Sequence, residues 1–264
     1  MKGVPGEKIK GVPSLFSLKD RVAVITGGSK GLGQGIGLAF AAAGAHVVPV
    51  SRTLEDLEAV SEEIRSLGRR SIPVVADVTL DEPVEAMVRR VMEEFGRIDI
   101  LVCSAGSFMS KPTIEWTTDD WLSIMNVNLK SIFICCREVG KVMVEQKSGK
   151  IINMSSVRGH QGRANDPAYP TSKGGLNMLT KSLAIEWAPY NITVNALAPT
   201  FIRTDINAAL LDDKKVYNWV VGRIPMGRVG EIPDLFGAAV FLASSASEFI
   251  TGQILYIDGG WTAA

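Results

Sequence analysis

From residue 21 onward, short apolar runs alternate with longer amphipathic stretches, and this alternation constrains the fold more than any other feature. Several of the amphipathic stretches end in glycine, a residue that often terminates helices. The apolar runs are VAVITG, HVVPVS, SIPVVADV, IDILVCSAG, GKIINMSS, ITVNALAP and GQILYIDGG. Continuous apolar strands that alternate with helices are typical of a parallel sheet buried on both faces. We therefore predict an α/β fold, with one doubly wound domain whose seven-stranded parallel sheet is flanked by helices on both faces.

The length of 264 residues allows one large domain or two small ones. No linker, repeat or low-complexity segment divides residues 21–264, which favours one domain. The first residues, MKGVPGEKIKGVPS, contain glycine, proline and lysine but lack the apolar centre of a secretory signal. We therefore expect an N-terminal arm at 1–17 and a single domain at 18–264.

The composition argues against several classes of function. Basic and acidic residues balance at 28 each, so the net charge gives no general attraction to nucleic acid or to a membrane surface. No apolar run reaches the roughly 18 residues of a membrane span. The only histidines, His46 and His160, and the cysteines Cys103, Cys135 and Cys136 lack metal-ligand spacing, so we expect no metal. We expect a cytoplasmic protein with a small-molecule ligand.

The carboxyl ends of the predicted strands indicate where that ligand binds. In open parallel sheets, ligands lie outside these ends, because the loops that follow the strands meet there. The predicted strand-end residues are Gly27, Ser51, Asp77, Ser104, Ser156 and Pro199.

The turn after the first predicted strand reads TGGSKGLG and opens the first predicted helix. Small residues at such a turn allow main-chain N–H groups to approach a pyrophosphate at the helix N-terminus. A tight turn without a ligand is the alternative, but the position within a first βαβ unit favours a dinucleotide. The turn residues expected to contact it are Gly27, Ser29, Lys30, Gly31, Leu32 and Gly33.

Tyr169 and Lys173 lie four residues apart in the stretch AYPTSK. Positions i and i+4 share one face of a helix, so the phenol and the ammonium would point into one site. Pro170 suits a helix start there, because proline is tolerated at the first helical position. A nearby cation favours the phenolate and is expected to lower the pKa of the tyrosine. The pair is a candidate general acid/base, although the same spacing also arises by chance.

Taken together and in order, these motifs resemble the short-chain dehydrogenase/reductase family. The order is TGGSKGLG, ADV, SAG, NVN, a serine, Tyr-x-x-x-Lys, NALAPT and DGG, across about residues 18–263. GRIPMGRVG and GAAVFLASSASEF resemble the gluconate 5-dehydrogenase-like branch of that family. The resemblance implies a Rossmann-type fold, a homotetramer, and hydride transfer between a nicotinamide cofactor and a carbonyl or secondary alcohol.

The resemblance also implies the catalytic roles. Tyr169 is then the acid/base, while Lys173 holds the nicotinamide ribose and lowers the pKa of the tyrosine. Ser156 hydrogen-bonds the reacting oxygen, and Asn128, rather than the first asparagine of NVNL, supports a proton-relay water. The family's spacing selects Ser156 over its neighbour Ser155, although a serine after a strand is by itself more often a cap.

Further cofactor contacts follow from the resemblance. Asp77 is expected to meet the adenine, with helix capping as its competing role. Ile202 and Thr204 match positions that contact the nicotinamide amide. The other expected contacts are Val78, Ser104, Ala105, Gly106 and Pro199, besides Tyr169 and Lys173.

This sequence departs from the family's pattern at two places beside the cofactor. Cys103-Ser104 replaces the usual Asn-Asn, and Pro199-Thr200 replaces the usual Pro-Gly. Both changes bear on local main-chain geometry rather than on the catalytic groups. We expect Cys103 to be a small buried residue rather than a nucleophile, because it ends an apolar strand.

The end of the second predicted strand determines the preferred cofactor. Relatives that use NAD place an aspartate there, whereas this chain has Ser51 followed by Arg52. A carboxylate would repel a 2′-phosphate, which a hydroxyl and a guanidinium would hold. Lys30 adds a second cation. Asp56 is the one carboxylate expected to compete with the 2′-phosphate, by pairing with Arg52. We predict a preference for NADP(H).

The loop after Ser156 reads VRGHQGRANDPA and favours a polyhydroxylated or sugar-acid ketone as substrate. It carries Arg158, His160, Arg163 and Asn165, and the predicted lid at about 204–227 adds Arg223. The alternative is that these are solvated loop charges. Other functions also stay open: a non-catalytic NADP-binding regulator, a nucleotide- or methyl-donor-binding enzyme, or a reductase of other small ketones or acyl thioesters. The complete catalytic set argues against a pure binding protein.

Overall fold

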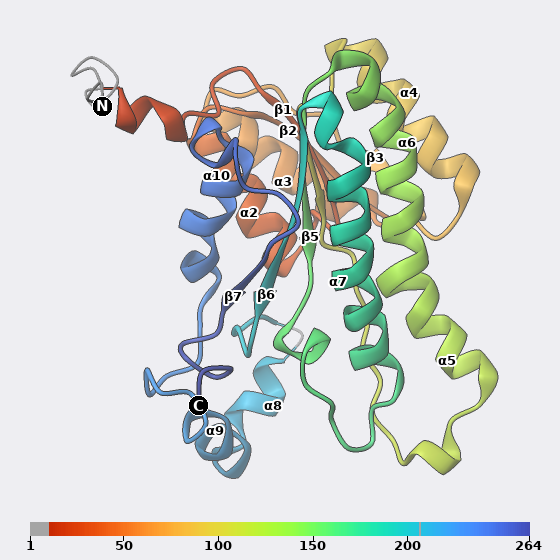
Figure 1. The fold of residues 1–264 in the computed structure, drawn as a ribbon, viewed down its shortest axis with the longest axis vertical. Helices are drawn as coiled ribbons and strands as arrows, with labels where there is room; N and C mark the ends of the chain where they lie inside the picture. The colour runs from red at the N-terminus through yellow and green to blue at the C-terminus, as the bar shows by residue number, and fades with distance from the viewer. Residues whose placement is uncertain (1–10, 206) are drawn as a thin grey trace.

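The computed structural model describes residues 11–205 and 207–264, which form one seven-stranded sheet with helices on both faces (Figure 1). The strands are β1 Val22–Thr26, β2 His46–Ser51, β3 Val74–Val75, β4 Ile100–Cys103, β5 Gly149–Met154, β6 Ile192–Pro199 and β7 Ile254–Ile257. Their order is β3-β2-β1-β4-β5-β6-β7, and all neighbours run parallel. The predicted fold class is confirmed. The strand order reverses between β1 and β4, which is where sheets of this kind bind ligands.

The strands match the predicted apolar runs unevenly. β6 has the predicted bounds, whereas β3 pairs over only Val74 and Val75 of the eight residues in its run. β3 lies at the edge of the sheet, where a strand has one neighbour, and Val75 is exposed. The apolar run therefore marks the strand but overstates its length.

Two layers of helices cover the sheet (Figure 1). Alternate residues of β1 supply both faces: Val22 and Val24 join one buried cluster, and Ala23 and Ile25 join the other. The first cluster includes residues of α4 Asp81–Phe95, α6 Ser131–Gln146 and α7 Ala168–Trp187. The second includes residues of α2 Gly31–Ala42, α3 Leu54–Ser66 and α10 Phe236–Ala243.

α5 Thr118–Met125 leads into α6 through a single π-helical turn, η3 Asn126–Lys130. Thr117 and Asp120 form a capping box that fixes the start of α5. In the π turn, the Ser131 N–H donates to the carbonyl oxygen of Asn126, five residues back. Such turns insert one extra residue into a helix and are frequent at functional sites. Here the inserted turn contains Asn128.

The chain between β6 and α10 extends beyond the carboxyl ends of the strands (Figure 1). It forms α8 Ala208–Asp212 and α9 Lys214–Val221, within the region predicted as a lid. Asp213 caps α9, because its Oδ1 accepts the Lys215 N–H at 2.8 Å. A small buried cluster joins this region to the body of the protein through Val157, Leu211, Val220, Ile224, Val229 and Trp261.

At its described start, the chain forms a short 3₁₀ helix, Val12–Phe16, and then enters the core. Leu18 is fully buried, and its N–H donates to the Ala43 carbonyl oxygen at 3.0 Å. Most of the predicted arm, residues 1–10, lies outside the described residues, so its boundary at residue 17 stays a prediction. In the part of the chain that the structure describes, no helix is long and apolar enough to cross a membrane.

Candidate active site

Tyr169 and Lys173 meet at the start of α7. The Lys173 Nζ lies 5.6 Å from the centroid of the Tyr169 ring, as the spacing of four residues requires. α7 begins at Ala168, so Pro170 is its third residue rather than the predicted first. The missing N–H of a proline is harmless there, because first-turn amides have no partner within the helix.

Lys173 is almost fully buried, and its Nζ donates to the Met154 carbonyl oxygen at 2.7 Å. Met154 is the last residue of β5, so this bond holds the ammonium at the carboxyl end of the sheet. Burial lowers the pKa of Lys173 to about 8. Its charge is therefore sensitive to pH just above neutrality.

Burial raises the pKa of the Tyr169 hydroxyl, and a side-chain hydrogen bond with Ser156 opposes that increase. The net shift of the Tyr169 pKa is therefore upward, whereas the sequence predicted a net lowering. The physical reason is that loss of solvent disfavours the phenolate more strongly than the surrounding groups favour it. Tyr169 therefore holds its proton at neutral pH, as an acid that donates to a carbonyl oxygen must.

Ser156 follows β5 and is nearly buried. Its Oγ accepts the Arg158 N–H at 3.1 Å and so caps a single 3₁₀ turn, η4 Val157–Gly159. The same side chain contacts Tyr169. Ser155 instead donates to Asn177 Oδ1 at 2.6 Å, which joins β5 to α7. The structure thus brings Ser156, and not Ser155, to the tyrosine hydroxyl.

Asn128 is fully buried and joins the segment after β4 to α7. Its Oδ1 accepts the Ser107 N–H at 2.8 Å, and its Nδ2 donates to the Ser107 carbonyl oxygen at 2.9 Å. Nδ2 also donates to Ser172 Oγ at 3.3 Å, and Ser172 donates to the Tyr169 carbonyl oxygen at 2.7 Å. Sequence reasoning missed Ser172. Its position in the chain between Tyr169 and Lys173 is the one feature of the sequence that could have indicated it. The proton-relay role of Asn128 stays a prediction.

The glycine-rich turn packs directly against the segment after β4. Gly27 and Gly31 have φ values of 66° and 57°, which side chains disfavour. A Cβ on Gly27 would lie 2.8 Å from the Ala105 main-chain nitrogen, and one on Gly33 would collide with the Gly27 carbonyl oxygen. Only glycine fits at these positions, so the main chain of the turn stays uncovered by side chains.

The two predicted cations beside β2 differ in their partners. Lys30 pairs with Asp56 at 3.0 Å, so the candidate pairing of Asp56 with Arg52 is wrong. The first turn of α3 lies closer to the glycine turn than the sequence indicated. Arg52 is exposed and, among the described residues, takes part in no ion pair. Ser51 beside it accepts the Thr53 N–H at 3.3 Å.

Asp77 stabilises the turn that follows β3. Its Oδ1 accepts from the Thr79 hydroxyl at 2.7 Å and from the Thr79 N–H at 2.9 Å, and these bonds lower the pKa of Asp77. The positive charge of Arg52 lowers that pKa further, which places Asp77 near Arg52. The competing expectation of helix capping is wrong, because α4 is preceded by Leu80 and has no side-chain cap. Val78 beside Asp77 is buried.

The segment after β6 closes the other side of the site. Asn207 orders it, since its Oδ1 accepts the Thr204 N–H at 2.9 Å and its Nδ2 donates to the Ile202 carbonyl oxygen at 2.7 Å. A Cβ on Gly31 would lie 3.8 Å from Thr204 Cγ2. The fold therefore brings Thr204, an expected nicotinamide contact, next to the glycine turn, although about 170 residues separate them in the chain.

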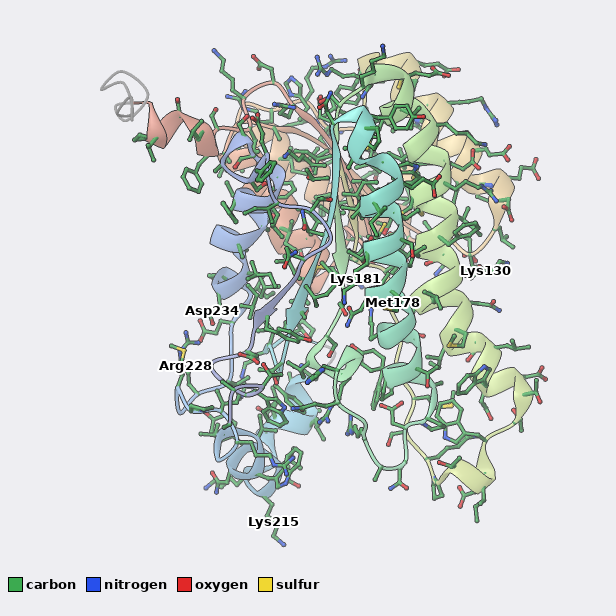
Figure 2. The ribbon with its side chains drawn as sticks, in the orientation of Figure 1. Lys130, Met178, Lys181, Lys215, Arg228 and Asp234 are labelled. Atoms are coloured by element: carbon green, nitrogen blue, oxygen red, sulfur yellow. The ribbon has the colours of Figure 1, made fainter. Side chains whose placement is uncertain are left out.

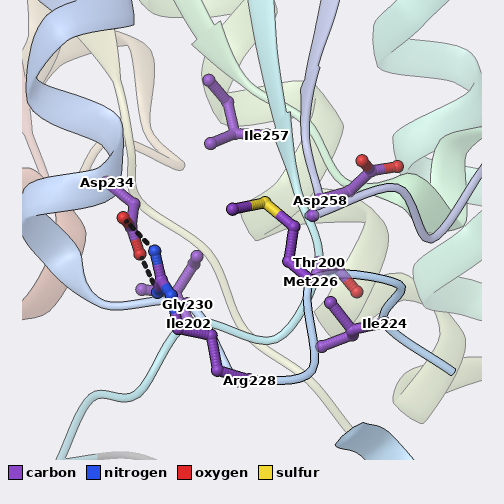
Figure 3. A pocket seen from close by; sticks show the side chains of 10 residues that line it. Thr200, Ile202, Ile224, Met226, Arg228, Gly230, Asp234, Ile257 and Asp258 are labelled. Carbon is purple, nitrogen blue, oxygen red and sulfur yellow. Dashed lines mark hydrogen bonds and ion pairs between the residues drawn. The ribbon is translucent and has the colours of Figure 1, made fainter. Parts of the chain in front are cut away.

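A cavity of about 230 Å³ adjoins this segment (Figure 3). Arg228 and Asp234 form a two-bond ion pair at its edge, with N–O distances of 2.7 and 2.8 Å. Its lining residues are Thr200, Ile202, Ile224, Met226, Arg228, Gly230, Asp234, Ile257, Asp258 and Gly259. None of the predicted catalytic residues lines it, and Ile202 is the predicted cofactor contact that does.

The polar loop residues proposed from the sequence divide into two pairs. The charges of Arg158 and Arg163 lower the pKa of Tyr169, so both lie near its hydroxyl. His160 instead packs edge-on against the Tyr256 ring at 6.4 Å, and the Asn165 carbonyl oxygen accepts the Lys111 N–H at 2.9 Å. The His160 side chain is therefore a weaker candidate for contact with substrate, and the Asn165 bond fixes only its main chain.

Asp166 is a further residue that the sequence did not indicate. It is 1% exposed, its Oδ1 accepts the Tyr169 N–H at 3.1 Å, and its Oδ2 has no hydrogen-bond partner among the described residues. Burial raises the pKa of Asp166. Cys103 is fully buried, as predicted, and hydrogen bonds with Cys135 and Cys136 raise its pKa, followed by burial.

Comparison with known proteins identifies the family. A family model described as enoyl-(acyl carrier protein) reductase matches residues 27–262. A 2-dehydro-3-deoxy-D-gluconate 5-dehydrogenase of Pseudoalteromonas atlantica is 42% identical over 93% of this chain and 97% of its own length. The chain belongs to the short-chain dehydrogenase/reductase family. The resemblance predicted from its motifs is confirmed, and the chain is an oxidoreductase.

Other relatives of this dehydrogenase carry related names. The gluconate 5-dehydrogenase of Gluconobacter oxydans is 35% identical over 95% of this chain and 98% of its own length. Among solved structures, a gluconate 5-dehydrogenase from Burkholderia cenocepacia, in complex with NADP and tartrate, has a TM-score of 0.91 and 38% identity. That alignment covers 95% of this chain and 98% of the other. The predicted likeness to the gluconate 5-dehydrogenase-like branch is confirmed.

Proposed function

We propose that this dehydrogenase transfers hydride between NADP(H) and the carbonyl or secondary alcohol of a polyhydroxylated ketone, in particular a sugar acid. The observation that carries the proposal is the cluster of Ser156, Tyr169 and Lys173 at the carboxyl end of β5. Relatives named as sugar-acid dehydrogenases support the choice of substrate class.

The cluster suits proton transfer to a carbonyl oxygen. Tyr169 holds its proton at neutral pH, because burial raises its pKa. During carbonyl reduction its hydroxyl donates that proton to the developing alkoxide, and Ser156 hydrogen-bonds the same oxygen. Lys173, fixed to Met154, places a positive charge beside the tyrosine and stabilises the phenolate that forms. Alcohol oxidation uses the same groups in reverse.

The residues around the glycine turn fit a dinucleotide. The diphosphate would lie along the main chain from Gly27 to Gly33, which side chains cannot cover. Ser51 and Arg52 would hold the 2′-phosphate, and Asp77, on which the charge of Arg52 acts, would meet the adenine. The bound cofactor supplies or accepts the hydride. The absence of an ion-pair partner for Arg52 among the described carboxylates supports NADP(H) over NAD(H).

The proposal is tested by following reduced-nicotinamide absorbance. The purified protein is offered NADPH with 5-keto-D-gluconate, NADP⁺ with 2-dehydro-3-deoxy-D-gluconate, and NADPH with a set of apolar ketones. We expect turnover of at least one sugar acid, with NADP(H) preferred. Turnover of apolar ketones alone would reject the substrate class, and no turnover of any compound would favour a binding protein.

We also propose a cytoplasmic homotetramer. Support comes from apolar side chains that are exposed on neighbouring helices: Phe133 on α6, and Met178 and Ile185 on α7. Figure 2 shows Met178 and Lys181 on the same helix.

The unpaired state of all three cysteines supports a reducing compartment. Light scattering that gives a monomer mass at micromolar concentration would contradict the assembly, and cell fractionation tests the compartment.

A further inference from the structure

Three guanidinium groups gather near Tyr169 from separate parts of the chain. Arg158 lies two residues after Ser156, Arg163 lies in the loop before α7, and Arg223 follows α9. Burial lowers the pKa of Arg158, and the charges of Arg163 and Arg223 lower it further. Arg158 and Arg163 also act on Tyr169. Arg158 and Arg223 lie against the same ring, Trp261, while Arg163 lies against Phe108, which packs on Tyr169.

None of these three cations has an ion-pair partner within the part of the chain that the structure describes. Asp166 is the carboxylate whose charge acts on Arg158, yet it forms no ion pair with it. One Asp166 oxygen accepts the Tyr169 N–H, and the other is buried without a partner. Asp166 offsets only part of the positive charge of Arg158 and Arg163, and a bound anion would offset the rest.

Aromatic rings hold the cations in place. The Cζ atoms of Arg158 and Arg223 each lie 5.7 Å from the Trp261 ring centroid, and Arg223 also lies 5.0 Å from Trp219. Cation–π contacts of this kind position a guanidinium and leave its N–H groups free to bind an anion. Trp261 is itself fixed, because it is buried and its Nε1 donates to Gln161 Oε1 at 2.8 Å.

Arg163 is positioned by a different ring, Phe108. Its Cζ lies 5.0 Å from the Phe108 ring, which packs edge-on against the Tyr169 ring at 5.7 Å. Arg158 is the best placed of the three to meet a substrate, because it is partly buried and follows Ser156 closely. Its Nη1 donates to the Gly162 carbonyl oxygen at 3.0 Å, which leaves other N–H groups unused.

We infer that Arg158, with Arg163 and Arg223 around it, forms a carboxylate subsite beside Tyr169, and that Trp261 is the positioning residue of Arg158. The inference rests on the proposed function and names the acid group as the feature of the substrate that this site recognises. The planar guanidinium matches a carboxylate with two parallel hydrogen bonds. Because Arg223 follows α9, a bound carboxylate also attracts the lid region toward the tyrosine.

The inference predicts that the enzyme discriminates between a sugar acid and the neutral ketose of the same stereochemistry. L-sorbose has a hydroxymethyl group where 5-keto-D-gluconate has a carboxylate, so the pair isolates that group. In Arg158→Ala, we expect the ratio of kcat/KM for the acid to that for the neutral ketose to fall at least tenfold, mainly through KM. Arg158→Lys keeps the charge without the fork and is expected to give an intermediate ratio. An unchanged ratio in Arg158→Ala would overturn the inference.

Trp261 is tested through the same ratio. Trp261→Phe keeps a ring under Arg158, whereas Trp261→Leu removes the cation–π contact. We expect the ratio to fall in Trp261→Leu by several-fold and to be largely retained in Trp261→Phe. A purely structural role would instead lower kcat/KM for acid and ketose equally in Trp261→Leu, and that result would contradict the positioning role.

A binding measurement keeps the inference testable if no ketone is turned over. Calorimetric titration of the NADP⁺-bound protein with D-gluconate and with tartrate is expected to show binding that weakens at least tenfold in Arg158→Ala. Arg89→Ala, on the exposed face of α4, is the matched control and should bind as the wild type does. Equal affinity of wild type and Arg158→Ala, or no binding by the wild type, would overturn the subsite. Absent turnover with intact, Arg158-dependent binding would reject the proposed function alone.

Discussion

The Lys173 ammonium donates a hydrogen bond of 2.7 Å to the main-chain carbonyl oxygen of Met154, which joins the first turns of α7 to the last residue of β5. Ser156 lies two residues after Met154, and Tyr169 lies one helical turn before Lys173. Together with the Ser155–Asn177 bond, the Lys173–Met154 bond fixes the distance between the serine and the tyrosine. The charge that makes the bond is also buried, at a cost in stability.

Lys173→Met should therefore change how stability depends on pH. The pKa of Lys173 is about 8 in the folded protein and 10.5 in the unfolded chain. Below pH 8, Lys173 is charged in both the folded and the unfolded protein, and the folded protein bears the full cost of burying that charge. Between pH 8 and 10.5, Lys173 keeps its proton only in the unfolded chain. Wild-type stability thus rises with pH across this window, by about 3 kcal/mol. Met carries no such charge.

The measurement is urea unfolding of both proteins at pH 7.5 and pH 10. Because other groups that titrate in this range are common to both proteins, the difference between them reports on Lys173. We expect the stability of the wild type relative to Lys173→Met to increase at the higher pH. A difference that does not vary with pH would show that the pKa of Lys173 is not lowered.

Tyr169→Phe removes the transferable proton and keeps the ring that packs against Phe108. We expect kcat to fall by about 10²–10⁴, the usual contribution of general acid catalysis, with little change in NADP(H) affinity. Steady-state kinetics and a fluorescence titration measure the two quantities. Tyr190→Phe, well separated in sequence and after α7, is the control. Turnover close to wild type in Tyr169→Phe would refute the acid/base role.

Arg52→Ala should weaken NADPH selectively. Arg52 is exposed beside Ser51, where a 2′-phosphate is expected. We expect its loss to raise KM for NADPH at least about tenfold, equivalent to about 1.4 kcal/mol, and to leave KM for NADH nearly unchanged. Equal use of both cofactors by the wild type, or equal losses in the variant, would show that Arg52 does not bind the phosphate.

Asp56→Asn tests the second cation of the same region. The Lys30–Asp56 pair, at 3.0 Å, is partly exposed and worth about 0–1 kcal/mol, so a dianionic phosphate outcompetes Asp56 for Lys30. Removing the carboxylate charge should leave KM for NADPH equal or slightly lower. An increase in that KM would mean that Asp56 orients Lys30 for the phosphate instead of competing for it.

Asn128→Ala should destabilise the protein as well as lower its activity. The change leaves the half-buried N–H and carbonyl groups of Ser107 without their partner and empties a fully buried position. Each unsatisfied group costs about 1–3 kcal/mol, so we expect a loss of about 2 kcal/mol or more in denaturant unfolding. Asn218→Ala, on the exposed side of α9, is the control and should change stability little. Similar stability of both variants would contradict this account of Asn128.

The sequence predicts best what depends on local spacing. The apolar run at Ile192–Pro199 became β6 without change, because a strand buried on both faces must be continuously apolar. Tyr169 and Lys173 meet because four residues make about one helical turn. β3 was overestimated because an apolar run does not report how many of its residues find a partner strand.

Properties that depend on contacts between distant segments could not be predicted from the sequence. The partner of Asp56 depends on how α3 packs beside the glycine turn, and the direction of the Tyr169 pKa shift depends on how deeply the phenol is buried. Trp261 and Arg158 are about 100 residues apart in the chain, so no local pattern links them. The short DGGW stretch gave no sign that its tryptophan would contact the loop after Ser156.

The π turn at Asn126–Lys130 has a consequence for how this gene tolerates change. Loss of one codon in this turn would leave the reading frame intact and would restore regular helical hydrogen bonding from α5 into α6. Because the π turn absorbs the extra residue, the helices on either side of the deletion would keep their relative orientation, and the apolar face of α6 would stay in the core. Within the turn, Asn128 would be displaced and would lose Ser107. The extra residue therefore serves the position of Asn128 rather than the packing of the helix.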